Sequence, residues 1–438
     1  MISHQKRREI LDALRRGTVP RQGLDQFAVG LQPFVDAVDD ELASVKAGAS
    51  QFKAVRGEYG AGKTFFARWL QERAKRDGFA AAEVQISETE TPLHRLETVY
   101  RRLMERLSTP NDPSGAFRSI VDGWFYTLEE DVIAAGSVSA SEEKALLAST
   151  NELMEKRLQS VARQAPAFAA ALRGYRRAMA DGNLPIAEGL LAWLAGQPNV
   201  AAGVKRFAGI KGDVDHFGAL SFLQGLLVIL RDSGHAGLVI TMDEVETLQR
   251  MRSDVRDKAL NALRQLVDEI DAGRFPGLYL LITGTPAFFD GPQGLKRLPP
   301  VEQRLHVDFN TDERFDNPRA VQIRLRGFDL ESLVELGKKV TSIYCFHSPH
   351  AERIQALADD AYIDQLAGAV TGKLGGKVGI APRVFLKKLV AEVLDRIDQF
   401  PDFDPHRDYK LTMSDAELTT VERDAAAAES VDDIEIDL

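Results

Sequence analysis

The chain has 438 residues, of which 44% are hydrophobic, and its formal net charge at pH 7 is −10. This length is enough for two or three domains, and the hydrophobic fraction is typical of a globular protein that buries a full core. The net negative charge argues against a protein that binds nucleic acid over its whole surface. The single cysteine, Cys345, excludes an internal disulfide framework and a cysteine-rich zinc site.

The sequence predicts neither a membrane span nor a secretion signal. No stretch approaches the ~20 consecutive apolar residues that a membrane helix needs. Residues 1–8 are basic but lack a following apolar core, so they do not read as a secretion signal. We therefore expect a cytoplasmic protein without membrane contact.

Residues 5–16 and 31–47 are predicted to form helices, joined by a loop over residues 17–30. The first helix carries an apolar stripe between basic side chains. These basic side chains could meet phosphates, although a solvated charged face is the commoner outcome for such a helix.

A phosphate-binding loop follows the first predicted strand, residues 52–56. Glycines let the backbone curl so that N–H groups point at a phosphate, and the next helix directs its N-terminus at the anion. Lys63 is expected to reach the β- and γ-phosphates, and the Thr64 hydroxyl is expected to ligate Mg²⁺. Residues 17–30 could then wrap the adenine. The predicted nucleotide-binding residues are Gly57, Glu58, Tyr59, Gly60, Ala61, Gly62, Lys63, Thr64 and Phe65.

A second strand is predicted at residues 81–86, but the next strand of the core is far along the chain. Roughly 180 residues separate the phosphate-loop lysine from the next strand that ends in carboxylates, more than short connections require. Much of residues 108–214 is therefore predicted to be an insertion, and its richness in Ala, Leu, Glu and Arg predicts helices. The neighbouring aromatics Trp124, Phe125 and Tyr126 are more typical of a core than of a base-stacking platform.

The next apolar run, residues 237–242, ends in two carboxylates, Asp243 and Glu244. Such a run is typical of a strand buried on both faces. In a nucleotide-hydrolysing fold, Asp243 would hold Mg²⁺ through water and Glu244 would polarise the attacking water. The alternative is a core strand followed by an acidic helix cap. Glu246 is the nearby competitor for the base, and we expect the following helix to carry it away from the site.

A third buried-strand run, residues 277–282, ends in small polar residues. A hydroxyl at such a strand end can lie beside the γ-phosphate, and we predict Thr283 for this sensing role, with Thr285 next. The alternative is an ordinary strand followed by a turn. Further along, Arg304 or Arg297 lies where an arginine finger acting on a neighbouring subunit belongs, although a surface arginine is the commoner outcome.

Residues 329–345 and 351–400 are predicted to form the helices of a lid domain. Pro382 suits the first turn of a helix, so Arg383 is placed near a helix start, where it could touch the γ-phosphate of its own subunit. The alternative is a solvated arginine. The acidic end of the chain, residues 429–438, is predicted to be a mobile tail, with a partner-docking peptide as the alternative.

Taken in order, these elements resemble an AAA+ ATPase of the origin-recognition-like branch. That resemblance implies Walker A, Walker B, sensor 1, arginine-finger and sensor 2 roles for the segments described above. A closer resemblance, which spans most of the chain, is to the BrxD-like ATP-binding proteins of BREX phage-defence systems. It is carried by residues 57–64, 215–220, 235–238, 243–248, 276–279, 284–289 and 381–383.

The expected fold is α/β: a P-loop AAA+ core with a central parallel sheet, a large helical insertion and a C-terminal helical lid. Origin-recognition relatives often carry a winged-helix DNA-binding domain after the lid, and the end of this chain is too short for one. Sequence-specific DNA binding is therefore not expected. The predicted domains are residues 1–107 and 215–327 for the two parts of the core, 108–214 for the insertion, 328–400 for the lid and 401–438 for an acidic tail.

These predictions describe an ATPase that needs ATP and Mg²⁺. The resemblance implies a homo-oligomer that works as a motor or switch in bacterial anti-phage defence, acting on double-stranded DNA or on other defence-system proteins. An assembly scaffold with slow turnover is the alternative, and a kinase-like phosphotransferase is a weaker one. Asp243 and Thr64 are the predicted metal ligands, and the residues predicted to take part in catalysis are Lys63, Glu244, Thr283, Arg304 and Arg383.

Overall fold

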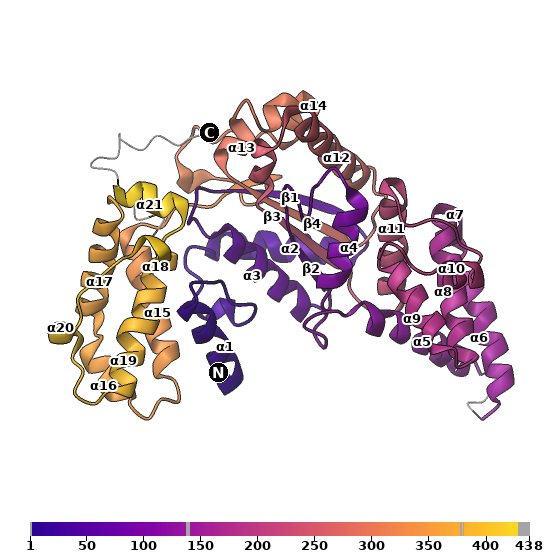
Figure 1. Ribbon diagram of the computed structural model, residues 1–438, viewed down its shortest axis with the longest axis horizontal. Helices are drawn as coiled ribbons and strands as arrows, with labels where there is room; N and C mark the ends of the chain where they lie inside the picture. The colour runs from indigo at the N-terminus through magenta and orange to yellow at the C-terminus, as the bar shows by residue number, and fades with distance from the viewer. Residues whose placement is uncertain (1, 137–140, 377–378, 380, 428–438) are drawn as a thin grey trace.

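A five-stranded parallel sheet lies at the centre of the computed structural model, which describes residues 2–136, 141–376, 379 and 381–427 (Figure 1). The strand order is β2-β3-β4-β1-β5, and all four neighbouring pairs are parallel. The expectation of an α/β fold with a central parallel sheet is therefore confirmed. The strands are β1 (Gln51–Arg56), β2 (Ala80–Gln85), β3 (Leu238–Asp243), β4 (Leu278–Gly284) and β5 (Gln322–Arg324).

The sheet separates two hydrophobic cores. Side chains alternate across a strand, so Tyr279 and Leu281 of β4 enter one core while Leu280 and Ile282 enter the other. Every residue of β3 and β4 is buried, as expected for strands that helices cover on both faces. This burial on both faces explains why the sequence of β3 and β4 is apolar almost throughout and does not alternate with polar residues.

The register of the sheet brings four strand ends to one edge. Gln85 of β2 lies opposite Asp243 of β3, and Met242 pairs with Ile282 of β4. Arg56, the last residue of β1, pairs with Gly284. The carboxyl ends of parallel strands are where ligands bind in open α/β sheets. The residues that follow β1, β3 and β4 therefore meet at this edge.

Helices cover both faces of the sheet. The first two helices of the structure lie close to the ranges predicted from the sequence, residues 5–16 and 31–47. They share a hydrophobic core with the helix that follows the phosphate loop and with the C-terminal helices. A second group of helices packs on the opposite face. The first group is α1 (His4–Arg15), α2 (Val35–Lys46) and α3 (Lys63–Arg76); the second includes α4 (Leu96–Arg106), α11 (His216–Asp232) and α12 (Ser253–Asp271).

A helical group lies beyond α4 and α11, at the right of Figure 1. The Trp124 ring nitrogen donates a 2.6 Å hydrogen bond to Asp232 at the end of α11, which fixes this group to the core. Trp124 and Phe125 are buried, whereas the Tyr126 side chain is 61% exposed, so the three aromatics form no common stacking platform. The helices are α5 (Phe117–Ala134), α6 (Glu143–Arg157), α7 (Gln159–Gln164), α8 (Pro166–Ala180), α9 (Leu184–Leu194) and α10 (Ala202–Phe207).

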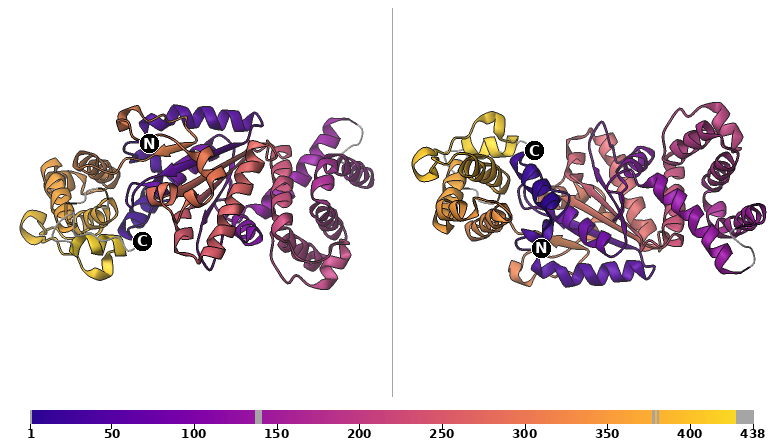
Figure 2. Two further views of the ribbon diagram at one scale, coloured as in Figure 1. Left: turned by 90° about the horizontal axis from the view of Figure 1, so that it is seen from above. Right: turned by 90° about the horizontal axis from the view of Figure 1, so that it is seen from below.

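The C-terminal helices lie at the opposite side of the sheet from that group (Figure 2). They pack against α1, where Arg15 forms a 2.7 Å ion pair with Asp395. A π-helical segment, Lys388–Leu394, continues α18. The helices are α15 (Leu330–Cys345), α16 (Ala351–Leu357), α17 (Asp360–Lys373), α18 (Pro382–Lys387), α19 (Asp395–Gln399), α20 (Pro405–Asp408) and α21 (Thr420–Ala427).

Residues 401–427 pack against these helices and do not form a free acidic tail. Leu418 joins the hydrophobic core on the side of the C-terminal helices, and the carboxylate of Glu422 is buried. Residues 429–438, for which we predicted a mobile tail, lie outside the described residues. The domain boundaries drawn from the sequence stay predictions.

The longest described helices are α12, with 19 residues, and α5, with 18 residues. Both bury one face against the core and expose charged residues on the other. Within the described part of the chain, no helix combines the length and apolarity that crossing a membrane requires.

Candidate functional site

The phosphate loop connects the end of β1 to the start of α3. Gly60 and Gly62 have φ angles of 84° and 88°, a region that side chains with a Cβ rarely adopt. The curled backbone lets the Lys63 ammonium donate hydrogen bonds to the carbonyl oxygens of Gly57, at 2.8 Å, and Glu58, at 3.3 Å. The predicted loop therefore forms. Its lysine bonds back to the loop carbonyls, and α3 begins at that lysine, with its N-terminus at the loop.

Asp243 is the centre of a hydrogen-bond network at the end of β3. The Thr64 hydroxyl donates to one carboxylate oxygen of Asp243 over 2.7 Å, and the Thr283 hydroxyl donates to the other. Asp243 is 4% exposed and Thr283 is fully buried. The structure thus brings together one residue from α3, one from β3 and one from β4. Hydroxyl and carboxylate oxygens are ligands that Mg²⁺ accepts together with water and phosphate oxygens, so these residues fit this ion.

Glu244 follows Asp243 in a left-handed conformation, with a φ angle of 60°. Its backbone N–H donates to the Thr283 hydroxyl over 3.3 Å, which helps to hold this uncommon conformation. The half-buried side chain accepts a 2.7 Å hydrogen bond from the Gln85 amide. Sequence analysis did not single out Gln85, because only the pairing of β2 with β3 brings it to Glu244.

Our expectation for Glu246 is wrong. Residues Val245–Arg250 form a 3₁₀ helix that turns back toward the phosphate loop, so Glu246 stays at the site. One of its carboxylate oxygens lies 3.8 Å from the Lys63 ammonium, and the residue is only 6% exposed. Burial raises the pKa of Glu246, while the positive charge of Lys63 acts against that shift. The phosphate loop therefore faces a third carboxylate.

Thr285 occupies a different position from Thr283. It is buried and precedes α13 (Pro286–Asp290), where its carbonyl oxygen accepts the N–H of Phe288 over 3.0 Å. Thr285 thus starts a helix, whereas Thr283 contacts Asp243 directly. Of the two candidates, Thr283 is the one at the network.

Both candidate finger arginines bind carboxylates of α12. Arg304, on α14 (Pro299–Leu305), forms an ion pair with Asp268, and Arg297 forms one with Asp257 over 2.9 Å. Arg304 is more exposed than Arg297 within its ion pair. These contacts hold the two side chains on the α12 side of the sheet, and their assignment to a neighbouring subunit stays a prediction.

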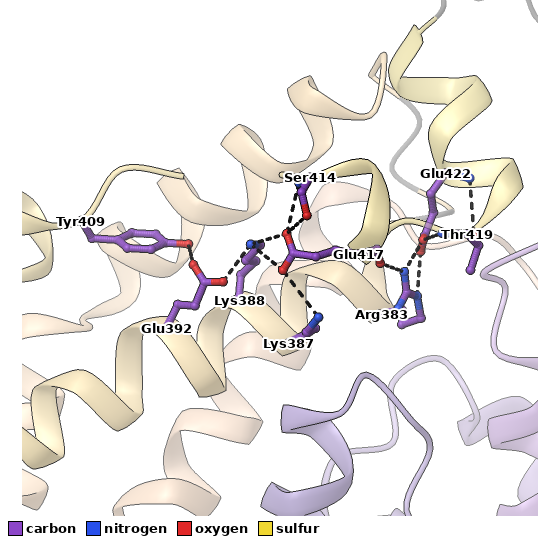
Figure 3. A network of polar contacts seen from close by, with 9 residues as sticks. All are labelled: Arg383, Lys387, Lys388, Glu392, Tyr409, Ser414, Glu417, Thr419 and Glu422. Carbon is purple, nitrogen blue, oxygen red and sulfur yellow. Dashed lines mark hydrogen bonds and ion pairs between the residues drawn. The ribbon is translucent and has the colours of Figure 1, made fainter. Parts of the chain in front are cut away.

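Arg383 is placed near the start of α18, as predicted, but it is not a solvated arginine. Its guanidinium donates to the carboxylate of Glu422 in α21 and, over 2.7 Å, to the carbonyl oxygen of Glu417 (Figure 3). The other end of the guanidinium faces the loop that follows α1, since a Cβ on Gly17 would lie 3.2 Å from its Nη1 atom. Arg383 therefore lies between the N-terminal loop and the C-terminal segment.

Comparison with known protein families gives a match that covers nearly the whole chain. The family of BREX system ATP-binding proteins BrxC/D matches residues 2–413. Neither the curated proteins nor the solved structures contain a significant match to this chain. The match includes the phosphate loop, the Asp243 network and the helix that carries Arg383, so the chain belongs to the BrxC/BrxD family of ATP-binding proteins of BREX systems.

Proposed function

We propose that this protein binds ATP with Mg²⁺ at the phosphate loop, hydrolyses it, and works as a motor or switch in bacterial anti-phage defence. The observation that supports this most is the position of Asp243, whose carboxylate accepts the hydroxyls of Thr64 and Thr283 beside the phosphate-loop lysine. A helix cap explains neither contact, because both hydroxyls come from other elements. Membership of an ATP-binding BREX family supports the same reading.

Each residue of the network has a chemical role in this proposal. The loop N–H groups and Lys63 bind the phosphates, and Thr64 and Asp243 hold the Mg²⁺. The ion supplies charge neutralisation on the phosphates. Glu244 polarises the attacking water and takes its proton, and for this its carboxylate must leave the amide of Gln85.

The Thr283 hydroxyl links the metal-binding side of the site to the base. It contacts the carboxylate of Asp243 and the backbone N–H of Glu244. A rearrangement around the γ-phosphate that moves Asp243 therefore changes the support of Glu244. This coupling is our argument for the sensing role of Thr283. In the same proposal the protein forms a homo-oligomer, and Arg304 completes the site of a neighbouring subunit.

An assembly scaffold with slow turnover is the second candidate function. Two contacts favour it: Glu244 is hydrogen-bonded to Gln85, and Arg383 is bound to Glu422. Both side chains that hydrolysis needs already have protein partners in this conformation. In a scaffold these contacts persist when ATP binds, whereas in a motor or switch they are released during the ATP cycle.

Turnover of the purified protein, measured against its own concentration with and without double-stranded DNA, separates the two functions. Specific activity that rises with concentration supports a site shared between subunits, and further stimulation by DNA makes nucleic acid the substrate acted on. Negligible turnover with tight ATP binding supports the scaffold. Lys63→Ala should abolish nucleotide binding, whereas Glu244→Gln should retain ATP but stop turnover. Equal loss of binding in both variants would exclude the role given to Glu244.

A further inference from the structure

Residues 414–427, which we call the C-terminal strap, place two glutamates against the cations of α18 and its continuation (Figure 3). The carboxylate of Glu417 binds the Lys388 ammonium at 3.0 Å and 3.1 Å, and it lies 3.5 Å from Lys387. The carboxylate of Glu422 binds Arg383. With two carboxylates the strap therefore contacts three neighbouring positively charged side chains, Arg383, Lys387 and Lys388.

The contact between Glu422 and Arg383 is the closest of these attachments. Arg383 donates from both Nε, over 2.9 Å, and Nη2 to the two oxygens of Glu422, a paired geometry that is strong for arginine and carboxylate. Glu422 is 4% exposed, so the carboxylate is shielded from water, whereas the Arg383 side chain is 32% exposed. The N–H of Thr419 also donates to Glu422 over 2.7 Å and fixes the orientation of the carboxylate.

The remaining side of Arg383 faces the loop that begins at Gly17. Its Nη1 atom lies against Gly17, and the loop that starts there is fastened to α3. The Glu72 carboxylate of α3 accepts the N–H groups of Gly23, at 2.7 Å, and Leu24, at 2.8 Å. Helix α3 begins at Lys63 of the phosphate loop. The loop from Gly17 to Leu24 therefore links Arg383 to the helix that starts at the proposed phosphate site.

We propose that Arg383 has two alternative anionic partners, the carboxylate of Glu422 and the terminal phosphate of ATP, so that the C-terminal strap is an autoinhibitory segment. This inference rests on the proposed ATP-binding function. One guanidinium cannot make its paired hydrogen bonds to both anions through the same nitrogens. The carboxylate is part of the same chain and competes at a high effective concentration. The γ-phosphate of ATP can bind Arg383 only when the strap releases that side chain. ADP lacks the γ-phosphate, so it does not compete with the strap.

Removal of one charge in the strap tests this competition. In the full chain, Glu422→Gln should tighten binding of a non-hydrolysable ATP analogue by about tenfold and leave the affinity for ADP unchanged. The matched control is Glu392→Gln, because Glu392 binds Lys388 and Tyr409 in the same network without contacting Arg383. The control should change neither affinity. An equal change for ATP and ADP in Glu422→Gln, or no change at all, overturns the inference.

Arg383→Ala distinguishes failure of this inference from failure of the proposed function. It should weaken binding of the ATP analogue but not of ADP, and Glu422→Gln should have no further effect in that background. Suppose that wild type binds ATP and that Arg383→Ala changes the ratio of the ATP-analogue and ADP affinities, while Glu422→Gln does not. The autoinhibitory role of the strap is then wrong and the proposed function stands. If wild type binds no ATP, the proposed function itself fails.

Hydrogen–deuterium exchange of the unmodified protein tests release of the strap without any substitution. Amides of residues 419–424 should exchange faster with the ATP analogue than with ADP, because the analogue displaces Glu422 and the helix that carries it. Exchange that is the same with both nucleotides, at saturating concentrations, contradicts the proposal. Because this experiment uses the wild-type protein, it tests the proposal even if Glu422→Gln fails to fold.

Discussion

Gln85 donates a 2.7 Å hydrogen bond to the carboxylate of Glu244, and this bond joins the end of β2 to the end of β3. A carboxylate that accepts a hydrogen bond is a weaker base for water, so Gln85→Ala should raise ATP turnover by about threefold and leave ATP affinity unchanged. Steady-state turnover and equilibrium binding measure the two quantities. Thr89→Ala, an exposed change in the loop after β2, is the control. Slower turnover in Gln85→Ala would instead make Gln85 a support that positions the base.

Thr283→Val removes a buried hydroxyl while keeping the shape of the side chain. The variant leaves Asp243 with one hydroxyl donor and the N–H of Glu244 with a weaker set of acceptors. We expect a loss of about 1–3 kcal/mol in the free energy of unfolding and weaker ATP binding in the presence of Mg²⁺. Urea unfolding and nucleotide titration with and without the ion check this. Thr285→Val is the matched control. Thr285 is also buried but starts α13, whereas Thr283 contacts Asp243, so the control should leave the effect of Mg²⁺ on affinity unchanged.

Glu246→Gln removes a buried charge 3.8 Å from Lys63. The carboxylate competes with phosphate for the ammonium, so the variant should bind ATP about threefold tighter. Burial raises the pKa of Glu246, so the wild type loses stability as pH rises from the ordinary value of 4.5 through the raised one. The variant should lack this loss in thermal unfolding curves. Abolished turnover with unchanged affinity would make Glu246, not Glu244, the base.

Arg304→Ala tests the shared site. If Arg304 acts on the nucleotide of a neighbour, the variant should bind ATP normally but lose turnover. A mixture with Lys63→Ala should then recover activity, since the Lys63 variant supplies Arg304 to an intact pocket. Arg297→Ala is the control, because its ion pair with Asp257 also fastens it to α12. No recovery in the mixture, at concentrations where the wild type is active, contradicts a trans role.

Acid should detach the strap from Lys388. Burial opposes the shift, but the hydrogen bond from Lys388 lowers the pKa of Glu417 from 4.5 to about 2, with help from the charge of Lys387 and the N–H of Ser414. The stabilisation is therefore complete above pH 4.5 and is lost as pH falls toward 2. Lys388 is buried but solvent reaches the Glu417 carboxylate, so we expect only about 1 kcal/mol. The difference in unfolding free energy between wild type and Glu417→Gln should be present at pH 7, shrink below pH 4.5 and vanish near pH 2.

Local sequence patterns predicted the elements that carry the site. Glycine spacing predicted the phosphate loop, and apolar runs ending in polar residues predicted the ends of β3 and β4. Parallel strands put these ends at one edge, and the direct contact of Thr283 with Asp243 is what the structure adds to that prediction.

Long-range contacts were beyond these patterns. Gln85 and Glu244 are 159 positions apart, and only the strand order makes them neighbours. Glu246 stays at the site because a 3₁₀ helix follows β3 where the pattern suggested an ordinary helix. Arg383 could be placed on its helix from Pro382, but its partner Glu422 lies in a segment whose acidic composition suggested a free tail.

The position of β1 within the sheet has a consequence for biosynthesis. Its two neighbours are β4 and β5, which start at Leu278 and Gln322, so β1 has no strand partner until the ribosome has made most of the chain. Until then both edges of β1 expose unpaired backbone groups. The helices α5–α10 make mainly local contacts and can fold while translation continues. We therefore expect nascent chains to gain their nucleotide site late, after the end of β5 has left the exit tunnel.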